Sequence, residues 1–177
     1  NRFIKFFFLF IFFNVSINAT TVATINIAFI LQSSDNYNIF LEDLNKLKQK
    51  TSKDLKQKED QLLNNKKDIE DSKIFLTDSE FQNKVNEYEI QVKNFENEIN
   101  ENNFIISKNI ELNKSLLIKE IILISQNLAI KKKIDIILNE DIFFISSDNL
   151  DVSNDIIDIL NNSNSVLLKI YNKEDLL

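Results

Sequence analysis

Six residue types are missing from this 177-residue chain: glycine, proline, cysteine, methionine, tryptophan and histidine. Without cysteine and histidine there is no disulfide, no thiolate nucleophile, no imidazole base and no Cys/His metal site. These absences exclude most nucleophilic triads and zinc chemistry, and the chain contains no nucleotide-binding motif. We therefore expect a protein that is not an enzyme, has no cofactor and does not use ATP.

The N-terminal residues 1–19, "NRFIKFFFLFIFFNVSINA", have the pattern of a secretory signal peptide: positive residues, an apolar run and then Ala19. A transmembrane anchor would need about twenty apolar residues, whereas the run at 6–13 has eight. Thr21 and Ala23 also fit the small residues before a cleavage site, so its position stays open by a few residues. Removing 1–19 leaves 19 Lys against 27 acidic residues, a net charge of −8. That sign argues against nucleic acid and against an anionic membrane surface as partners.

A β-strand is predicted at residues 23–29, "ATINIAF", where apolar residues alternate with Thr24, Asn26 and Ala28. Ser34 or Asp35 is a suitable N-cap for a helix from about 36 to 75. The sequence "TDSE" (77–80) has the spacing of a capping box and predicts the start of a second long helix. That helix carries apolar residues at alternating spacings of four and three, with Asn102 as a polar interruption. The positions of this heptad seam are Phe81, Val85, Tyr88, Val92, Phe95, Ile99, Asn102 and Ile106.

Two such helices separated by a short break predict an antiparallel hairpin, roughly 60 to 80 Å long at about 1.5 Å per residue. The hairpin should project as a thin arm, because nothing thicker than a two-helix seam is available to bury it. Beyond residue 115 the second helix becomes apolar nearly all round, so it needs more than one partner. Short apolar runs at 134–139 and 141–146 then predict two strands, and Ser153 is predicted to cap a short final helix.

These strands and the final helix total only about 45 residues, near the lower limit for an independent core. An exposed sheet edge and a broad apolar helix face would aggregate if left uncovered. We therefore predict a homo-oligomer in which several small β bodies close on each other. The predicted body combines 23–34 with 131–161, the arm spans 35–130, and the tail 162–177 has no predicted role. The residues predicted to form the oligomer core are Ile25, Ile27, Ile136, Leu138, Phe143 and Ile145.

Two segments resemble the Skp/OmpH family of periplasmic chaperones. "TINIAFILQSS" (24–34) is similar to the family's opening strand and the turn into its first arm helix. "IDIILNEDIFFISSDNLDVSNDIIDIL" (134–160) is similar to its closing segment, with a strand pair, a Ser-Ser-Asp turn and the start of the last helix.

The resemblance implies an α+β, mostly α fold: a long antiparallel coiled-coil hairpin on a small β body that closes in a trimer. It also implies a periplasmic holdase whose arms surround a cavity and keep unfolded outer-membrane β-barrel proteins soluble without ATP. Arms in this family are basic, whereas residues 42–67 here hold eight Lys against five acidic residues and residues 68–101 three against ten. A lipopolysaccharide-binding cluster cannot be carried over, because no matching basic group is present. The acidic outer segment keeps open a second hypothesis, a structural coiled-coil protein of the envelope that has no client.

The apolar residues at the arm tip have two interpretations: packing within the tip, or contact with a client. These residues are Ile74, Phe75, Leu76 and Phe81. The acidic segment "DNLDVSND" (148–155) lacks the ligand spacing and the glycine of an EF-hand, so it is interpreted as a turn and a helix cap rather than a metal site. The cluster "KKK" (131–133) is interpreted as a complement to the helix C-terminal dipole.

Overall fold

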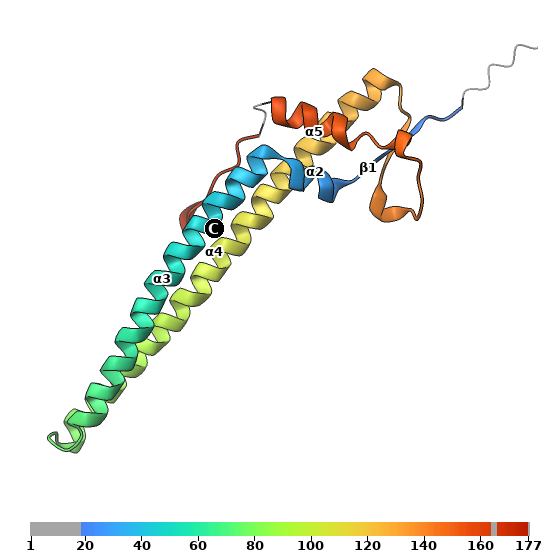
Figure 1. Cartoon of the computed structure of the whole chain (residues 1–177). Helices are drawn as coiled ribbons and strands as arrows, with labels where there is room; N and C mark the ends of the chain where they lie inside the picture. The colour runs from blue at the N-terminus through green and yellow to red at the C-terminus, as the bar shows by residue number, and fades with distance from the viewer. Residues whose placement is uncertain (1–18, 164–165, 177) are drawn as a thin grey trace, which may run out of the picture.

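The computed structural model describes residues 19–163 and 166–176. It consists of a long helical hairpin with a small body at one end (Figure 1). The predicted signal peptide lies outside the described residues, except for Ala19. Within the described part of the chain, no helix is both long enough and apolar enough to span a membrane.

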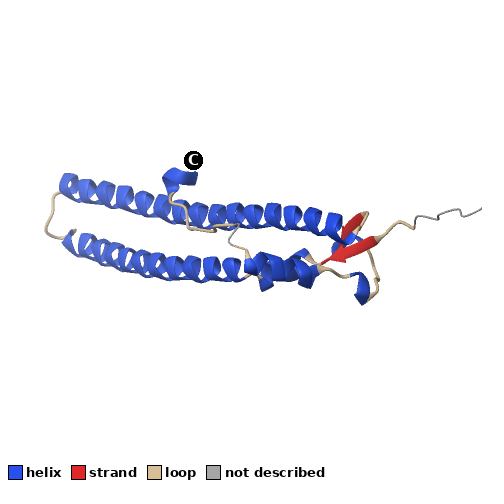
Figure 2. Cartoon of the chain, turned by 90° about the horizontal axis from the view of Figure 1, so that it is seen from above, coloured by secondary structure: helices blue, strands red, loops and turns tan. Residues whose placement is uncertain are grey.

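The body joins the two ends of the family-like region, as predicted. Strand β1 (Val22–Ile25) pairs in parallel with β2 (Ile136–Asn139), with Val22 opposite Ile136 and Ile25 opposite Asn139. The other side of β1 forms an isolated bridge between Thr24 and Asp151. The chain therefore leaves the body after β1, makes the whole arm and returns beside its starting strand (Figure 2).

The predicted strand at 23–29 is wrong after Ile25. Helix α2 (Ile27–Ser33) begins there, and the side chain of its N-cap, Asn26, accepts a hydrogen bond from the Phe29 N–H at 2.8 Å. Helical spacing buries Ile30 and Leu31 together in the core, whereas strand alternation would have placed them on opposite faces. Burial on the body and a strong N-cap therefore outweigh the alternating pattern.

The predicted strand at 141–146 is also wrong. A short 3-10 helix, η1 (Glu140–Ile142), interrupts the run directly after β2, and a second, η2 (Asp148–Leu150), follows. Side-chain hydrogen bonds hold the chain where it leaves β2 and enters η1. Asn26 donates to the Glu140 carboxylate at 2.7 Å, and Asn139 donates to the Asp141 carboxylate at 2.9 Å. Within the described residues the sheet therefore contains only β1 and β2, the bridge to Asp151 lies on the other side of β1, and the outer edge of β2 stays unpaired. The loop instead leaves its apolar side chains exposed, namely Ile142, Phe144 and Ile145.

The arm is formed by α3 (Asp35–Ser72) and α4 (Asp78–Lys132). Both predicted caps are confirmed: the Ser34 hydroxyl accepts from the Tyr37 N–H, and Thr77 and Glu80 form a complete capping box. The helices have 38 and 55 residues, so they are about 57 and 82 Å long. Because α4 is the longer, its last turns continue past the arm into the body (Figure 1).

The core lies where α4 meets α2 and α5 (Ser153–Asn162). It contains the broad apolar face predicted beyond residue 115, here Leu117, Ile121, Ile124 and Leu128. Opposite them lie Ala23, Ile25, Ile30, Leu31, Val152, Ile156 and Leu160. A helix face this wide is buried because two elements cover it from different sides.

The predicted cap of the last helix needs a correction. Ser153 is the first helical residue, and the Asp151 carboxylate accepts its backbone N–H at 2.8 Å. The Ser153 hydroxyl accepts the Asn26 N–H at 2.8 Å, so it joins α5 to the β1–α2 junction. At the end of α4 the three lysines occupy the C-terminus as predicted, and Lys132 forms an ion pair with Asp155 at 2.6 Å. The chain ends with α6 (Lys173–Leu176).

Candidate functional site

The turn at the arm tip exposes two of its four predicted apolar residues. Ile74 and Phe75 are 81% and 83% exposed. Leu76 and Phe81 are half-buried, and the Lys73 ammonium lies 5.5 Å from the centre of the Phe81 ring. The tip thus presents Ile74 and Phe75 to solvent, whereas Leu76 and Phe81 pack within it.

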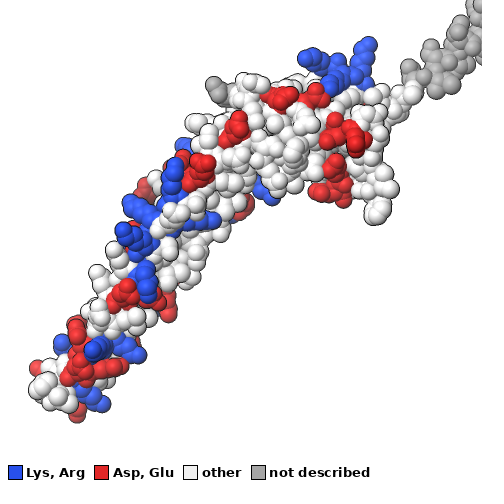
Figure 3. Space-filling view, viewed as in Figure 1, with Lys and Arg blue, Asp and Glu red and all other residues white. Residues whose placement is uncertain are grey.

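Charge is unevenly distributed along the arm (Figure 3). Lys58 on α3 pairs with Glu98 on α4 at 2.5 Å and so marks the middle of the hairpin. The residues from this pair outward, 58–98, hold six Lys against eleven acidic residues. At the capping box, hydrogen bonds from the Thr77 hydroxyl and N–H hold the pKa of Glu80 below its usual value. The outer arm is therefore acidic at neutral pH.

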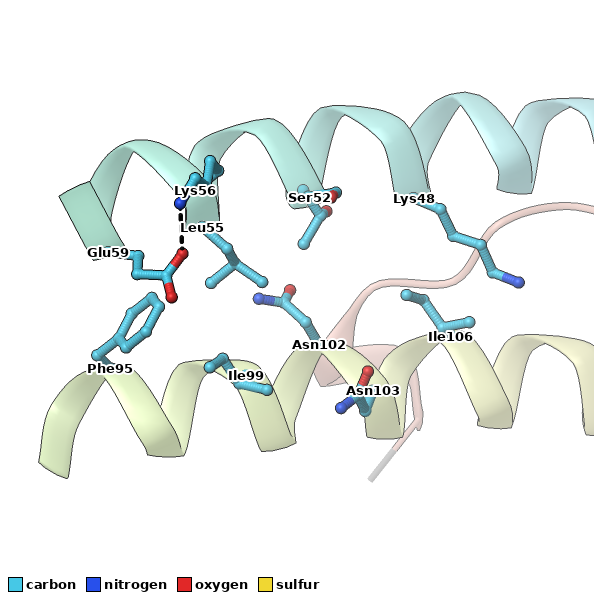
Figure 4. Close-up of a pocket in the computed structure, with 11 residues that line it drawn as sticks. Lys48, Ser52, Leu55, Lys56, Glu59, Phe95, Ile99, Asn102, Asn103 and Ile106 are labelled. Atoms are coloured by element: carbon cyan, nitrogen blue, oxygen red, sulfur yellow. Dashed lines mark hydrogen bonds and ion pairs between the residues drawn. The ribbon is translucent and has the colours of Figure 1, made fainter. Parts of the chain in front are cut away.

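An apolar groove lies between α3 and α4 on the inner half of the arm (Figure 4). Leu55 from α3 faces Phe95 and Ile99 from α4 across it, and Asn102 points into the same space. The groove has a volume of about 410 Å³, and the Lys56–Glu59 ion pair lies at its edge. The heptad pattern predicted the positions on α4, Phe95, Ile99 and Asn102, but it does not indicate that a groove remains between the two helices.

The predicted oligomer-core residues are divided between two places. Ile25 is buried in the core of the single chain and Ile27 packs against that core, so these two already have partners. Ile136 and Ile145 are 45% and 82% exposed, while Leu138 and Phe143 are half-buried. Together with Ile142 and Phe144, the exposed residues form an apolar edge made of β2 and the loop that follows it.

The tail after α5 packs on α4 through contacts that the sequence analysis did not anticipate. Two fully buried side chains of α4, Asn109 and Asn113, hold it in place. Asn109 accepts the Tyr171 N–H at 2.7 Å and donates to the Tyr171 carbonyl at 2.9 Å. Asn113 forms the same pair of bonds with Lys169, at 3.1 and 2.9 Å. A signal was present: both asparagines continue the spacing of the heptad seam, where an apolar residue is the rule.

The structure does not place the acidic residues in a metal site: no group of ligating side chains able to hold a metal ion occurs among residues 19–163 and 166–176. The segment 148–155 forms η2 and the cap of α5 instead, as its interpretation as a turn and cap predicted.

The architecture defines a class of protein in which a long helical hairpin projects from a small body of mixed helix and strand. The sequence model of the family described as "Outer membrane protein (OmpH-like)" matches residues 21–160, and the chain belongs to this family. No curated protein matches the chain. Among solved structures, the fold is similar to the crystal structure of an OmpH-like protein from Caulobacter crescentus, assigned as an outer membrane chaperone. The TM-score is 0.77 at 11% identity, over 87% of this chain and 90% of that one.

Proposed function

We propose that this protein is an ATP-independent holdase chaperone of the periplasm. It binds unfolded outer-membrane β-barrel proteins between its arms and keeps them soluble until they reach the outer membrane. Membership of the OmpH-like family supports a chaperone role, and the signal-peptide pattern of residues 1–19 supports the location. The observation that carries the proposal is the arm itself, which projects from the body and ends in Ile74 and Phe75, two large apolar side chains that the described residues leave exposed.

The proposed assembly is a homotrimer closed through the apolar edge of the body. β2 pairs with β1 on one side only within the described residues, and Phe144 is 98% exposed in the loop beside it. An unpaired strand edge next to exposed apolar side chains promotes association unless a partner covers it. Three bodies joined there would place three arms around one cavity, so many weak contacts could hold one client at high effective concentration.

Apolar contact, rather than charge, dominates client binding in this proposal. Exposed ion pairs contribute about 0–1 kcal/mol each and are screened by salt, and the outer arm is net acidic. Full burial of a large apolar side chain contributes roughly 1.5–3 kcal/mol. Even half of that from Ile74 and Phe75 together gives about 1.5–3 kcal/mol per arm, or roughly a tenfold to hundredfold effect on binding.

The test is aggregation of a urea-unfolded outer-membrane β-barrel protein on dilution, followed by light scattering. We expect the wild-type protein to suppress scattering, and Ile74→Ser with Phe75→Ser to weaken this at least tenfold. Leu63→Ser with Ile90→Ser is the matched control, because these residues are 57% and 61% exposed but lie on the shaft of the arm. We expect little change between low and physiological salt. Failure of the wild-type protein to suppress scattering would refute the proposal, and a strong loss with salt would refute the apolar mechanism.

The alternative is a structural coiled-coil protein of the envelope that binds no client. The acidic outer arm is the observation in its favour, because it differs from the basic arms that the resemblance led us to expect. The same scattering experiment separates the two, since a scaffold would leave client aggregation unchanged. An enzymatic role is the weakest of the three, because the chain lacks histidine and cysteine and the carboxylates of the arm lie on solvated helix faces.

A further inference from the structure

The contacts of Asn109 and Asn113 with the tail involve the backbone of the tail and none of its side chains. Each amide nitrogen also donates to the carbonyl four residues earlier on α4, that of Ile105 or Asn109. Each asparagine therefore uses both N–H donors and its oxygen acceptor, which fixes its orientation and satisfies a buried polar group. A site that binds only backbone groups accepts many different sequences.

The spacing of the two asparagines matches that of an extended strand. Residues four apart on a helix are separated by about 6.0 Å along its axis, and residues two apart on a strand by about 6.4–6.8 Å. Alternate residues of a strand direct both their N–H and their C=O groups to the same edge. Asn109 and Asn113 therefore bind Tyr171 and Lys169, and the tail runs antiparallel to α4.

The exposure of the tail side chains alternates from residue 166 to residue 170. Val166, Leu168 and Ile170 are half-buried, and Leu168 packs against the core cluster. Between them, Leu167 is 81% exposed and Lys169 is also exposed. Strands of transmembrane β-barrels also present alternate side chains to two different surroundings. The tail resembles such a strand in this period-two exposure and in the apolar residues on its packed side, although its exposed side includes the apolar Leu167.

The tail is held by contacts that a similar segment could replace. None of its described residues, 166–176, is fully buried. Besides the asparagine contacts, it is held by the packing of Leu168 against the core cluster, by the exposed Lys173–Glu101 ion pair at 2.7 Å and by a 3.4 Å hydrogen bond from Asn36 to the Val166 carbonyl. Exposed ion pairs add little, and a competing strand would offer the same backbone groups to both asparagines.

We propose that the α4 surface around Asn109 and Asn113 is a binding site for extended segments with an apolar residue at every second position, and that the protein's own tail occupies this site until a client displaces it. The tail is thus a built-in competitor that covers the site when no client is present. This inference rests on the proposed chaperone function, because the displacing segment is a strand of an unfolded outer-membrane protein.

The first experiment is amide hydrogen exchange of the full chain, with and without a urea-unfolded outer-membrane β-barrel protein. We expect the Lys169 and Tyr171 amides to be protected in the free protein and to lose that protection when the client is bound. Continued protection at saturating client would overturn the proposal. If the chain suppresses client aggregation while the tail stays protected, the inference fails and the chaperone function stands.

The second experiment uses full-length variants and a fluorescent peptide with the sequence of residues 166–173. Lys169→Pro with Tyr171→Pro removes both N–H groups that the asparagines accept and should release the tail. We expect this variant to bind the peptide at least tenfold more tightly than the wild-type protein. Leu167→Pro is the control, because that residue contributes no backbone group to either asparagine. Equal binding by all three proteins would overturn the proposal.

The asparagines are tested in the tail-released variant. Asn109→Leu with Asn113→Leu keeps the branching and the number of side-chain heavy atoms but removes the hydrogen bonds to the tail backbone, so we expect peptide binding to fall at least tenfold. Asn103→Leu, at an exposed position of the same helix, should leave it unchanged. Helical content measured by circular dichroism shows that each variant is folded. Undiminished binding by the double asparagine variant would overturn the proposal. This peptide measurement does not depend on client aggregation. It therefore tests the proposed site at Asn109 and Asn113 separately from the chaperone function.

Discussion

Replacing Ser153 with alanine tests the contact that joins the two ends of the body. The Ser153 side chain is fully buried, and its hydroxyl accepts the Asn26 N–H at 2.8 Å while it donates to the Asp151 carboxylate at 2.5 Å. Ser153→Ala leaves the half-buried Asn26 N–H without its partner, and an unsatisfied donor costs about 1–3 kcal/mol when fully buried, so the lower end of this range applies. It also removes one of the donors to a carboxylate, which contributes in the same direction. We therefore expect the free energy of unfolding to fall by about 2 kcal/mol or more.

The assay is urea unfolding followed by far-ultraviolet circular dichroism, at one fixed protein concentration because association shifts apparent stability. The dependence of unfolding free energy on urea should be the same for variant and wild type, so that the midpoint reports stability. Ser147→Ala is the control, since Ser147 precedes η2 and its side chain makes no capping bond. Amide exchange at Asn26 gives a local measure of the same contact. A loss below about 0.5 kcal/mol, with Asn26 still protected, would show that the hydroxyl does not support this junction.

Two further predictions concern the apolar edge and the arm tip. Phe144→Ser with Ile145→Ser should raise the monomer fraction in sedimentation equilibrium at micromolar concentration, whereas Ile90→Ser on the arm should not; a wild-type protein that is already a stable folded monomer would contradict the trimer. The pKa of Glu80 is lower in the folded state than in the unfolded state. The stability that its carboxylate gives to the capping box is therefore complete above the unfolded-state pKa, and it is lost as the pH falls through the folded-state pKa. The protection factors of the amides at residues 77–81, which correct exchange for its intrinsic pH dependence, should therefore fall in acid, and Glu80→Gln should remove that pH dependence; identical pH profiles for both proteins would contradict this role.

The parts of the fold that depend on neighbouring residues were predictable from the sequence. Ser34 and the Thr77–Glu80 pair cap the arm helices because a short polar side chain can reach the free N–H groups of the first turn. The heptad seam predicted the hairpin, and the apolar face beyond residue 115 predicted a junction with several partners. Each of these signals spans a few turns of helix and needs no knowledge of distant residues.

The parts that depend on distant partners were not predictable in the same way. Residues 27–29 alternate like a strand, yet they begin a helix because the core offers a place for Ile30 and Leu31. Residues 141–146 have strand composition, but the chain turns into η1 after β2, where distant Asn26 donates to the Glu140 carboxylate. The tail site was missed because two asparagines in a heptad seam can mean a polar interruption or a ligand for another segment. Only the position of residues 169 and 171 in the structure shows that the asparagines bind another segment rather than interrupt the seam.

The parallel pairing of β1 and β2 has a consequence for the order in which the molecule folds. Their paired residues are more than a hundred positions apart, so closing the sheet from an unstructured chain requires closing a very long loop. Formation of the α3–α4 hairpin needs only a five-residue turn between its helices, and it brings the two strands to the same end of the arm. Formation of the arm thus lowers the entropy cost of bringing β1 and β2 together. Contacts that are local in sequence, including those of the arm, should accordingly form first, and the small sheet of the body should form last. The body then folds on an arm that has already formed.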